Sequence, residues 1–343
     1  MAERTLTERE LNRALLARQL LLERARTPIP KALERMAGLQ AQYAPSMYIG
    51  LWSRLEGLER DAVTRGLERG SIVQGSMMRA TIHLVSKRDY WPFVVGIRKG
   101  LREWCLRTWG RGVDRREIAA NDRKVRRALA GKTLSRAELE EILGQRLGAA
   151  GLWVDLVRVP PSGTWERRRA DRYALAEDWV GPEDAKPEEG IAHLVRRYLQ
   201  GFGPARPAEI ADWAGLDVTT TKHALERLDL RTFQDEQGKA LVDLPRLPLP
   251  DADTPAPARF LPVWDATLLV HARRTGILPE RYRPRVFNVK TPHSMNTFLV
   301  DGQVAGTWRY EQGRIELEPF GRLDRETRAE LEEEAGRLAA FHV

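Results

Sequence analysis

The chain has 343 residues, of which 42% are hydrophobic and 30% charged, with a single cysteine and six histidines. This composition is typical of a globular protein with a substantial core, and the length suits two to four structural units. No uncharged apolar run reaches the roughly 18 residues of a membrane span, and the first residues lack a signal-peptide core, so we expect no membrane association. One cysteine excludes an intramolecular disulfide and favours a cytoplasmic protein.

The charge balance is basic, with 56 Lys and Arg against 48 Asp and Glu, a net charge of +8. Such an excess indicates a polyanionic partner. Residues 98–127 concentrate it, since eleven basic residues there accompany four acidic ones. Arg98, Arg102 and Arg107 are therefore candidates for contacts with phosphate groups. The alternative is that this stretch is only a solvated helix face.

The first segment, residues 1–110, has the element order of a winged helix, in which three helices precede a strand hairpin. Thr7 and Glu10 have the spacing of a capping box at a helix start. Local signals predict helices that begin after Thr7, at Pro30 and at Pro45, a helix near residues 61–69 and an alternating strand at 77–85.

A pair of glutamines, Gln40 and Gln42, flanks Ala41 between the second and third predicted helices. Carboxamides hold a water molecule without carrying charge, so this pair is the best candidate for chemistry in the segment. Residues two apart on a regular helix point about 200° apart, so the side chains converge only if the backbone is not helical at Ala41. Pro45 favours such an interruption because it disfavours helix at Ala44. The alternative is that both glutamines cap a helix end.

The strand predicted at residues 77–85 contributes three further candidates for active-site support. Strand geometry would place Arg79, Thr81 and His83 on one face. His83 would then orient a phosphate or a sugar near the glutamines, although a purely structural histidine is an equal alternative.

The second segment, residues 111–185, has two predicted helices followed by a long arm. This basic arm, residues 159–169, carries Arg167, Arg168 and Arg169 beside Trp165. The arginines suit a DNA-contacting wing, while a plain exposed turn is the alternative.

The third segment, residues 186–245, contains a helix-turn-helix pattern with Gly215 at the turn. A proline-rich linker, residues 246–258, leads to the last segment, 259–343. Its predicted strands are at residues 285–289, 297–308 and 314–317, followed by a helix at 325–341. Asp301-Gly302 is a strong hairpin signal within it. Asp265 in this segment either caps a turn or contacts the site.

Five ordered motifs make the whole chain resemble the winged-helix DNA glycosylases of the AlkZ/YcaQ type. They are residues 39–42, 79–85, 163–173, 260–269 and 300–308. The resemblance implies an α+β fold of three tandem winged-helix units followed by a small C-terminal β-barrel with a terminal helix. It also implies a monomer that acts on double-stranded DNA, in the cytoplasm with the nucleoid.

In this family a Gln-apolar-Gln or Gln-apolar-Asp motif marks the active centre, so the resemblance implies that Gln40 and Gln42 are catalytic. The implied activity is monofunctional excision of N7-alkylated purines, including bulky adducts and interstrand crosslinks. Such purines are cationic and leave with little protonation, which suits uncharged glutamines that position water.

No nucleotide-binding, zinc or serine-hydrolase motif occurs, so we expect neither a metal nor a cofactor. The alternative function is that of a non-enzymatic winged-helix transcriptional regulator, in which the glutamines are structural. Both functions predict salt-dependent binding to DNA.

Overall fold

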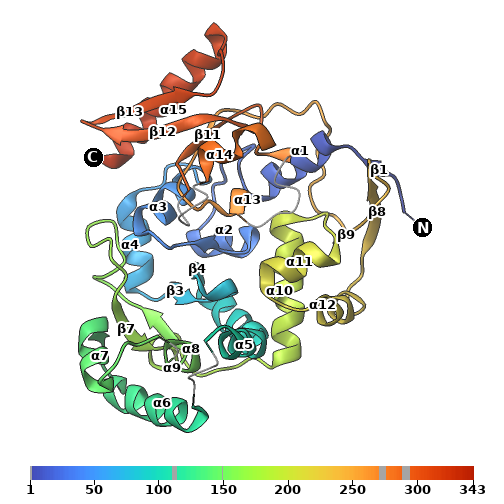
Figure 1. Cartoon of the computed structure of the whole chain (residues 1–343). Helices are drawn as coiled ribbons and strands as arrows, with labels where there is room; N and C mark the ends of the chain where they lie inside the picture. Colours follow the sequence, from blue (N-terminus) through green and yellow to red (C-terminus); the bar gives the residue numbers. More distant parts are fainter. Residues whose placement is uncertain (1, 110–113, 149, 270–275, 288–293) are drawn as a thin grey trace.

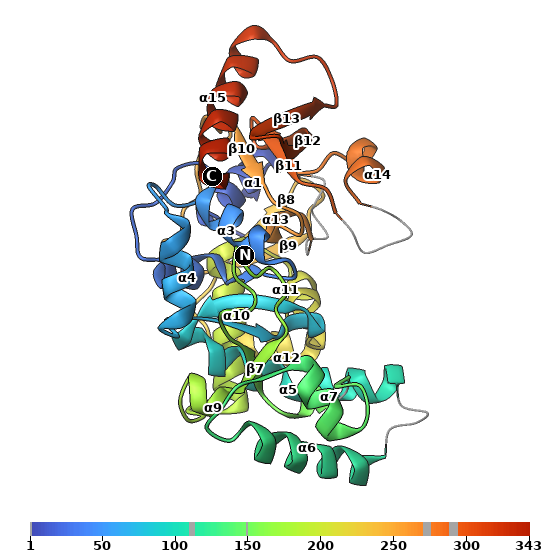
Figure 2. The same ribbon diagram turned by 90° about the vertical axis from the view of Figure 1, so that its left-hand side faces the viewer.

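The computed structural model describes residues 2–109, 114–148, 150–269, 276–287 and 294–343. These residues form a mixed α+β fold, elongated in the view of Figure 2, with three β-sheets. The C-terminal sheet and α15 lie at one end of the molecule, and α6 and α7 lie at the other (Figure 1, Figure 2).

The first segment forms the centre of the molecule. Its elements are β1 (Thr5–Leu6), α1 (Glu8–Arg18), α2 (Ile29–Met36), β2 (Leu39–Gln40), α3 (Ala44–Trp52), α4 (Arg60–Glu68), β3 (Ile72–Ser76), η1 (Met78–Ala80), β4 (Ile82–Ser86) and α5 (Lys87–Trp109). The capping box predicted for Thr7 and Glu10 is present at the start of α1. Proline stands in the first turn of both α2 and α3, where its missing N–H costs nothing.

The second and third segments follow a similar plan. The second contains α6 (Arg115–Leu129), β5 (Leu134–Ser135), α7 (Arg136–Leu143), α8 (Ala150–Trp153), β6 (Leu156–Arg158), β7 (Arg172–Leu175) and α9 (Ala176–Trp179). The third contains α10 (Pro187–Phe202), α11 (Pro207–Ala214), α12 (Val218–Leu225), β8 (Arg231–Asp235) and β9 (Ala240–Asp243).

One topology recurs in all three segments. A helix leads into a short extended stretch, helices follow, and a hairpin closes the unit. The extended stretch pairs each time with the last hairpin strand: β2 with β4, β5 with β7, and Ala205 with Val242 in the third unit. The chain therefore repeats one supersecondary plan three times.

The first two units share a single antiparallel sheet of six strands, in the order β2-β4-β3-β6-β7-β5. The junction is the pairing of β3 with β6, in which Gln74 faces Arg158 and Gly75 faces Val157. The boundary predicted between residues 110 and 111 lies outside the described residues, and the sheet extends across both segments. The third unit has its own sheet, in which β1 pairs with β8 in parallel.

The uninterrupted strand predicted at residues 77–85 is wrong. The chain leaves β3 at Ser76, passes through η1 and re-enters the sheet as β4 at Ile82. Arg79 and Ala80 both have left-handed backbone angles, with φ of 56° and 58°. Such angles reverse the chain, so this stretch is the connection of a hairpin rather than one strand.

The last segment is an open sheet, and the predicted closed barrel is not found in the described residues. Its elements are β10 (Arg259–Leu261), α13 (Ala266–Leu269), η3 (Glu280–Tyr282), α14 (Arg283–Val286), β11 (Thr297–Val300), β12 (Gln303–Glu311), β13 (Arg314–Pro319) and α15 (Arg325–His342). The four strands pair in the order β10-β11-β12-β13. Four strands are too few to enclose a packed interior, and α15 contributes apolar residues to the same core instead.

Two further predictions in this segment have different outcomes. The strand expected at residues 285–289 is wrong as far as it is described, because Arg285 and Val286 belong to α14; residues 288 and 289 lie outside the described residues. The hairpin at Asp301-Gly302 is confirmed, with φ of 47° and 77°, both in the left-handed region that this turn requires.

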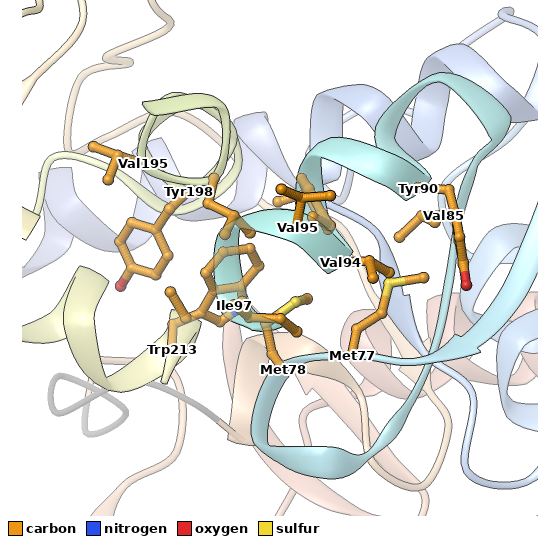
Figure 3. Close-up of a cluster of buried hydrophobic side chains, with 14 of the residues drawn as sticks. Met77, Met78, Val85, Tyr90, Val94, Val95, Ile97, Val195, Tyr198 and Trp213 are labelled. Carbon is orange, nitrogen blue, oxygen red and sulfur yellow. The ribbon is translucent and has the colours of Figure 1, made fainter. Parts of the chain in front are cut away.

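The largest hydrophobic core joins the first unit to the third through α5 and α10. Met77 and Met78 lie in this cluster with Val94 and Ile97 of α5 (Figure 3). The two helices cross closely at glycines, since a Cβ atom on Gly96 would lie 2.7 Å from the carbonyl carbon of Gly190. Among the residues that the structure describes, no helix has both the length and the apolar sequence needed to cross a membrane.

Candidate active site at the Gln-Ala-Gln motif

The turn after α2 sets the position of the two glutamines. Helix α2 ends at Met36, and Ala37 and Gly38 follow with φ of 64° and 79°. Gly38 lies tightly against β4, because a Cβ atom there would be 2.9 Å from Val85 Cγ1 and 3.0 Å from the Leu84 carbonyl oxygen. Glycine is therefore required for the chain to enter β2 directly beside β4.

The first glutamine of the motif is in a strand and the second is in a bend beyond it. Gln40 pairs with His83 across β2 and β4, and the Ala41 N–H donates to the Ile82 carbonyl at 2.8 Å. Directly paired residues of an antiparallel sheet have their side chains on the same face, so Gln40 shares the face of His83. The backbone is not helical at Ala41 or at Gln42, which is the condition for the two glutamine side chains to converge.

The carboxamides of Gln40 and Gln42 differ in exposure and in hydrogen bonding. Gln42 is exposed, and its Oε1 accepts a hydrogen bond from the Ile82 N–H at 3.1 Å. A carboxamide oxygen has two acceptor positions, so one remains for a water molecule. Gln40 is half-buried, beside its cross-strand neighbour His83.

His83 is buried and uncharged. Its Nδ1 donates to the Thr81 carbonyl oxygen at 3.1 Å, which leaves Nε2 with a free lone pair when the ring is neutral. Burial and then the charge of Arg79 lower the pKa of His83 to about 3, against the opposing effect of the bond to Thr81. The imidazole is therefore a neutral hydrogen-bond acceptor at neutral pH.

Arg79 does not share the strand face of Thr81 and His83, contrary to the prediction. It lies in η1, and its Nη1 donates to the carbonyl oxygen of Trp213 in α11 at 2.5 Å. Burial lowers the pKa of Arg79. The residue links the first unit to the third, and it acts on the site through its charge beside His83.

The basic arm lies beside the motif. Arg167, Arg168 and Arg169 are exposed, and Arg168 Nη1 donates to the Tyr43 hydroxyl at 3.0 Å, directly after Gln42 in the chain. With Arg172 they line an open hollow of about 310 Å³. A basic surface therefore adjoins the glutamines.

Two buried side chains hold the arm in place. Trp165 packs edge-on against Tyr48 of α3, with ring centroids 5.6 Å apart. Gln74 of β3 donates from Nε2 to the Gly163 carbonyl at 2.8 Å. Sequence reasoning missed Gln74 and Tyr43. The available signals were a polar residue inside the apolar start of β3, which is Gln74, and an exposed tyrosine next to the motif, which is Tyr43.

Two of the three candidate arginines from residues 98–127 bond to other parts of the protein, and the third is exposed. Arg98 forms ion pairs with Asp155 at 3.1 Å and Glu183 at 2.5 Å. Arg102 Nη2 donates to the Trp153 carbonyl oxygen at 2.9 Å. Arg107 is exposed on α5. None of these contacts involves the Gln-Ala-Gln motif, and a role in binding phosphate stays a prediction for all three.

Asp265 serves the structure around the site. Its two carboxylate oxygens accept from Nη1 and Nη2 of Arg54, each at 2.9 Å, and both side chains are buried. Arg54 is the second residue after the end of α3, so this pair fixes the far end of the helix that begins after Gln42 and Tyr43. No group of three potential metal ligands occurs in the described parts of the chain.

The buried neutral state of His83 has a testable effect on stability. Because its pKa falls from about 6.5 to about 3 on folding, the folded chain binds fewer protons between these values. His83 should therefore lower the free energy of unfolding by about 1.4 kcal/mol for each pH unit below 6.5. Replacing His83 with glutamine should flatten the dependence of urea-measured stability on pH between 6.5 and 4.5.

A matched control for this measurement is the exposed His223 on α12. His223→Gln should keep the wild-type pH dependence. His342, whose pKa is lowered to about 4 by burial and by Arg60 and Arg168, contributes equally in both variants. An unchanged slope in His83→Gln would show that the ring is not held neutral by burial.

Comparison with known proteins identifies the family. The structure superposes on DNA glycosylase AlkZ of Streptomyces sahachiroi with a TM-score of 0.83 and 20% identity, covering 98% of this chain and 97% of that one. An interstrand DNA cross-link repair glycosylase of the same organism is 24% identical over 351 residues, covering 94% of this chain and 93% of that protein. Residues 33–341 match the model of the family described as DNA glycosylase AlkZ-like. The chain belongs to the AlkZ-like DNA glycosylase family.

Proposed function

We propose that this protein is a monofunctional DNA glycosylase that hydrolyses the N-glycosidic bond of N7-alkylated purines in double-stranded DNA, including bulky adducts and interstrand crosslinks. The observation that supports the proposal is that Gln40 lies opposite the neutral His83 on β2 and β4, while Gln42 is bonded to the Ile82 N–H next to His83 and Arg168 contacts Tyr43 next to Gln42. Membership of the glycosylase family and the relative named for cross-link repair support it.

The chemistry of the lesion matches this set of groups. Glycosidic hydrolysis passes through an oxocarbenium-like state and ordinarily needs an acid for the leaving group and a base for the water. An N7-alkylated purine already carries positive charge, so it leaves without an acid. The remaining tasks are to position a water molecule and to stabilise charge that develops on the sugar.

Each residue then has a defined role. The Ile82 N–H holds the Gln42 carboxamide, whose second acceptor position accepts a hydrogen bond from the attacking water. The proton that this water loses on attack passes to solvent. Gln40 and the lone pair on His83 Nε2 orient the same water or the sugar from the neighbouring strand. An uncharged acceptor is a poor base, so undamaged purines, which need stronger catalysis, are left intact.

We further propose that the three repeated units are winged helices that bind the duplex as a monomer. The basic arm, with Arg167, Arg168 and Arg169, then contacts phosphate groups next to the lesion. A chromosomal substrate implies that the protein works in the cytoplasm at the nucleoid.

The decisive experiment incubates the protein with duplexes that carry N7-methylguanine or an interstrand crosslink, in several surrounding sequences. We expect release of the free alkylated base, alkali-labile abasic sites without strand cleavage by the protein, and equal activity in EDTA. A transcriptional regulator would release no base and would prefer one sequence. Sequence-specific binding without base release would therefore overturn the proposal.

A further inference from the structure

A second basic cavity lies on the six-stranded sheet, at the ends of β3, β6 and β7. Its volume is about 180 Å³, and its polar lining comes from Ser76, Arg136, Arg158 and Tyr173. The other lining residues are apolar or glycine, so no carboxylate lines it. Each water takes about 30 Å³ in the liquid, so the cavity has room for a hydrated anion of moderate size.

Arg158 gives this cavity an uncompensated positive charge. Its Nη1 donates to Ser76 Oγ at 3.2 Å, and its guanidinium lies 5.3 Å from the centre of the Tyr173 ring. Its Nε is buried without a hydrogen-bond partner. Burial lowers the pKa of Arg158, against the opposing effect of Tyr173, and the charge of Arg136 acts in the same direction as burial. Within the described residues, Arg158 forms no ion pair.

Three fully buried arginines of this protein each pair with a carboxylate: Arg13 with Asp301, Arg18 with Asp243, and Arg54 with Asp265. The half-buried Arg158 has no such partner, and the buried Arg259 also has none among the described residues. Arg158 differs from Arg259 in lining an open cavity, so an anion that enters this cavity could supply the missing counter-charge. A planar guanidinium matches the oxygens of a phosphate group well.

The location of the cavity indicates which anion fits. Ser76 pairs with Ile82 at the end of the β3–β4 hairpin, and the Ile82 N–H holds Gln42. Ser76, Ile82 and Arg158 lie on the sheet face opposite to Gln40 and His83, so a duplex that reaches both must cross this end of the sheet. Two to three strand spacings of about 4.8 Å place the cavity roughly 10–15 Å from Gln42. Ser135, which precedes Arg136, lines the hollow of the basic arm. The two basic hollows therefore adjoin each other at the start of α7.

We propose that this cavity binds a backbone phosphate of the same DNA duplex, with Arg158 and Arg136 as its ligands. At about 3.4 Å of duplex axis for each nucleotide of a strand, this phosphate lies about three or four nucleotides from the lesion. The cavity then contributes to DNA affinity irrespective of sequence and lesion. The inference rests on the proposed function only in requiring that the protein binds duplex DNA.

The test measures affinity for an undamaged duplex at several salt concentrations. Arg158→Gln and Arg136→Gln should each weaken binding and reduce the slope of log affinity against log salt by about 0.9 for one lost phosphate contact. The matched control is Arg231→Gln, which removes the same charge from a half-buried arginine of β8 that is paired with Glu3. It should keep the wild-type slope.

The melting temperature of Arg158→Gln distinguishes a role in binding phosphate from a structural role of Arg158. Arg158 has no ion pair to lose, so Arg158→Gln should melt no lower than the wild type, as expected for a residue retained for binding. If Arg158→Gln does not fold, Arg136→Gln still tests the site, because Arg136 is exposed. Wild-type slopes in the folded variants would overturn the proposal.

A separate experiment tests free phosphate as the ligand. Inorganic phosphate at fixed ionic strength should raise the melting temperature of the wild type less than duplex DNA does. If phosphate protects the wild type but not Arg158→Gln, while DNA affinity is equal in both, the cavity is a free-anion site and the proposal is wrong. If the wild type itself fails to bind DNA, the proposed function fails instead.

Discussion

Replacing Gln42 with alanine is expected to lower the rate of N7-methylguanine excision by at least about 100-fold, because the attacking water loses its fixed acceptor. Gln40→Ala should have an effect in the same direction. Binding to undamaged duplex should persist, since the arginines of the basic arm are untouched. Single-turnover excision and a binding titration on the same variants separate the two quantities.

Two further variants make this result specific. Gln42→Glu keeps an acceptor for the Ile82 N–H and for water, so it should be more active than Gln42→Ala. Gln237→Ala removes an exposed glutamine in the turn between β8 and β9 and should excise at the wild-type rate. If Gln40→Ala and Gln42→Ala both retain the wild-type rate, the glutamines are structural and the site lies elsewhere.

The largest effect on stability is expected at Asp265. Asp265→Leu leaves the buried Arg54 without its partner and should lower the free energy of unfolding by about 3–5 kcal/mol. The double variant Arg54→Met/Asp265→Leu removes both charges and should recover most of this loss. Urea denaturation of the two variants measures the difference, which tests whether the penalty comes from the stranded charge.

An exposed ion pair provides the comparison. Arg26 and Glu56 are 2.7 Å apart with side chains 83% and 48% exposed. Glu56→Gln should cost no more than about 1 kcal/mol, because water screens both charges. Equal losses in Glu56→Gln and Asp265→Leu would contradict the assignment of Asp265 to a buried structural pair.

Local features of the fold followed from the sequence. The capping box at Thr7 and the hairpin at Asp301-Gly302 depend on residues within four positions of each other. Short-range steric and hydrogen-bonding preferences decide such features. The break in the strand at Arg79 and Ala80 was missed, because neither residue type favours the left-handed backbone angles that it adopts.

The pairing of strands that lie far apart in the sequence could not be predicted from such local signals. The junction of β3 and β6 aligns Gln74 with Arg158, which lie 84 residues apart, and no local signal specifies that register. The prediction of a C-terminal barrel failed for a similar reason, because the number of strands in a sheet depends on which strand edges pair with each other. Alternation of residue types predicts strands but not their neighbours.

The candidate site was predicted in part. The sequence singled out Gln40 and Gln42, whose catalytic role stays a prediction, and the condition for their convergence, a backbone that is not helical at Ala41. It did not predict that burial and Arg79 keep His83 neutral, since both depend on packing between units. The contact of Arg168 with Tyr43 spans 125 residues and became visible only in the folded chain.

The continuous six-stranded sheet has a mechanical consequence. Hydrogen bonds join β2, which carries Gln40, through β4 and β3 to β6, which leads into the basic arm, so these parts cannot hinge independently. Accommodation of lesions that differ in size must then come from deformation of the nucleic acid, or from movement of the third unit and the C-terminal sheet. Rigidity of this frame would make the enzyme sensitive to how easily the damaged duplex bends.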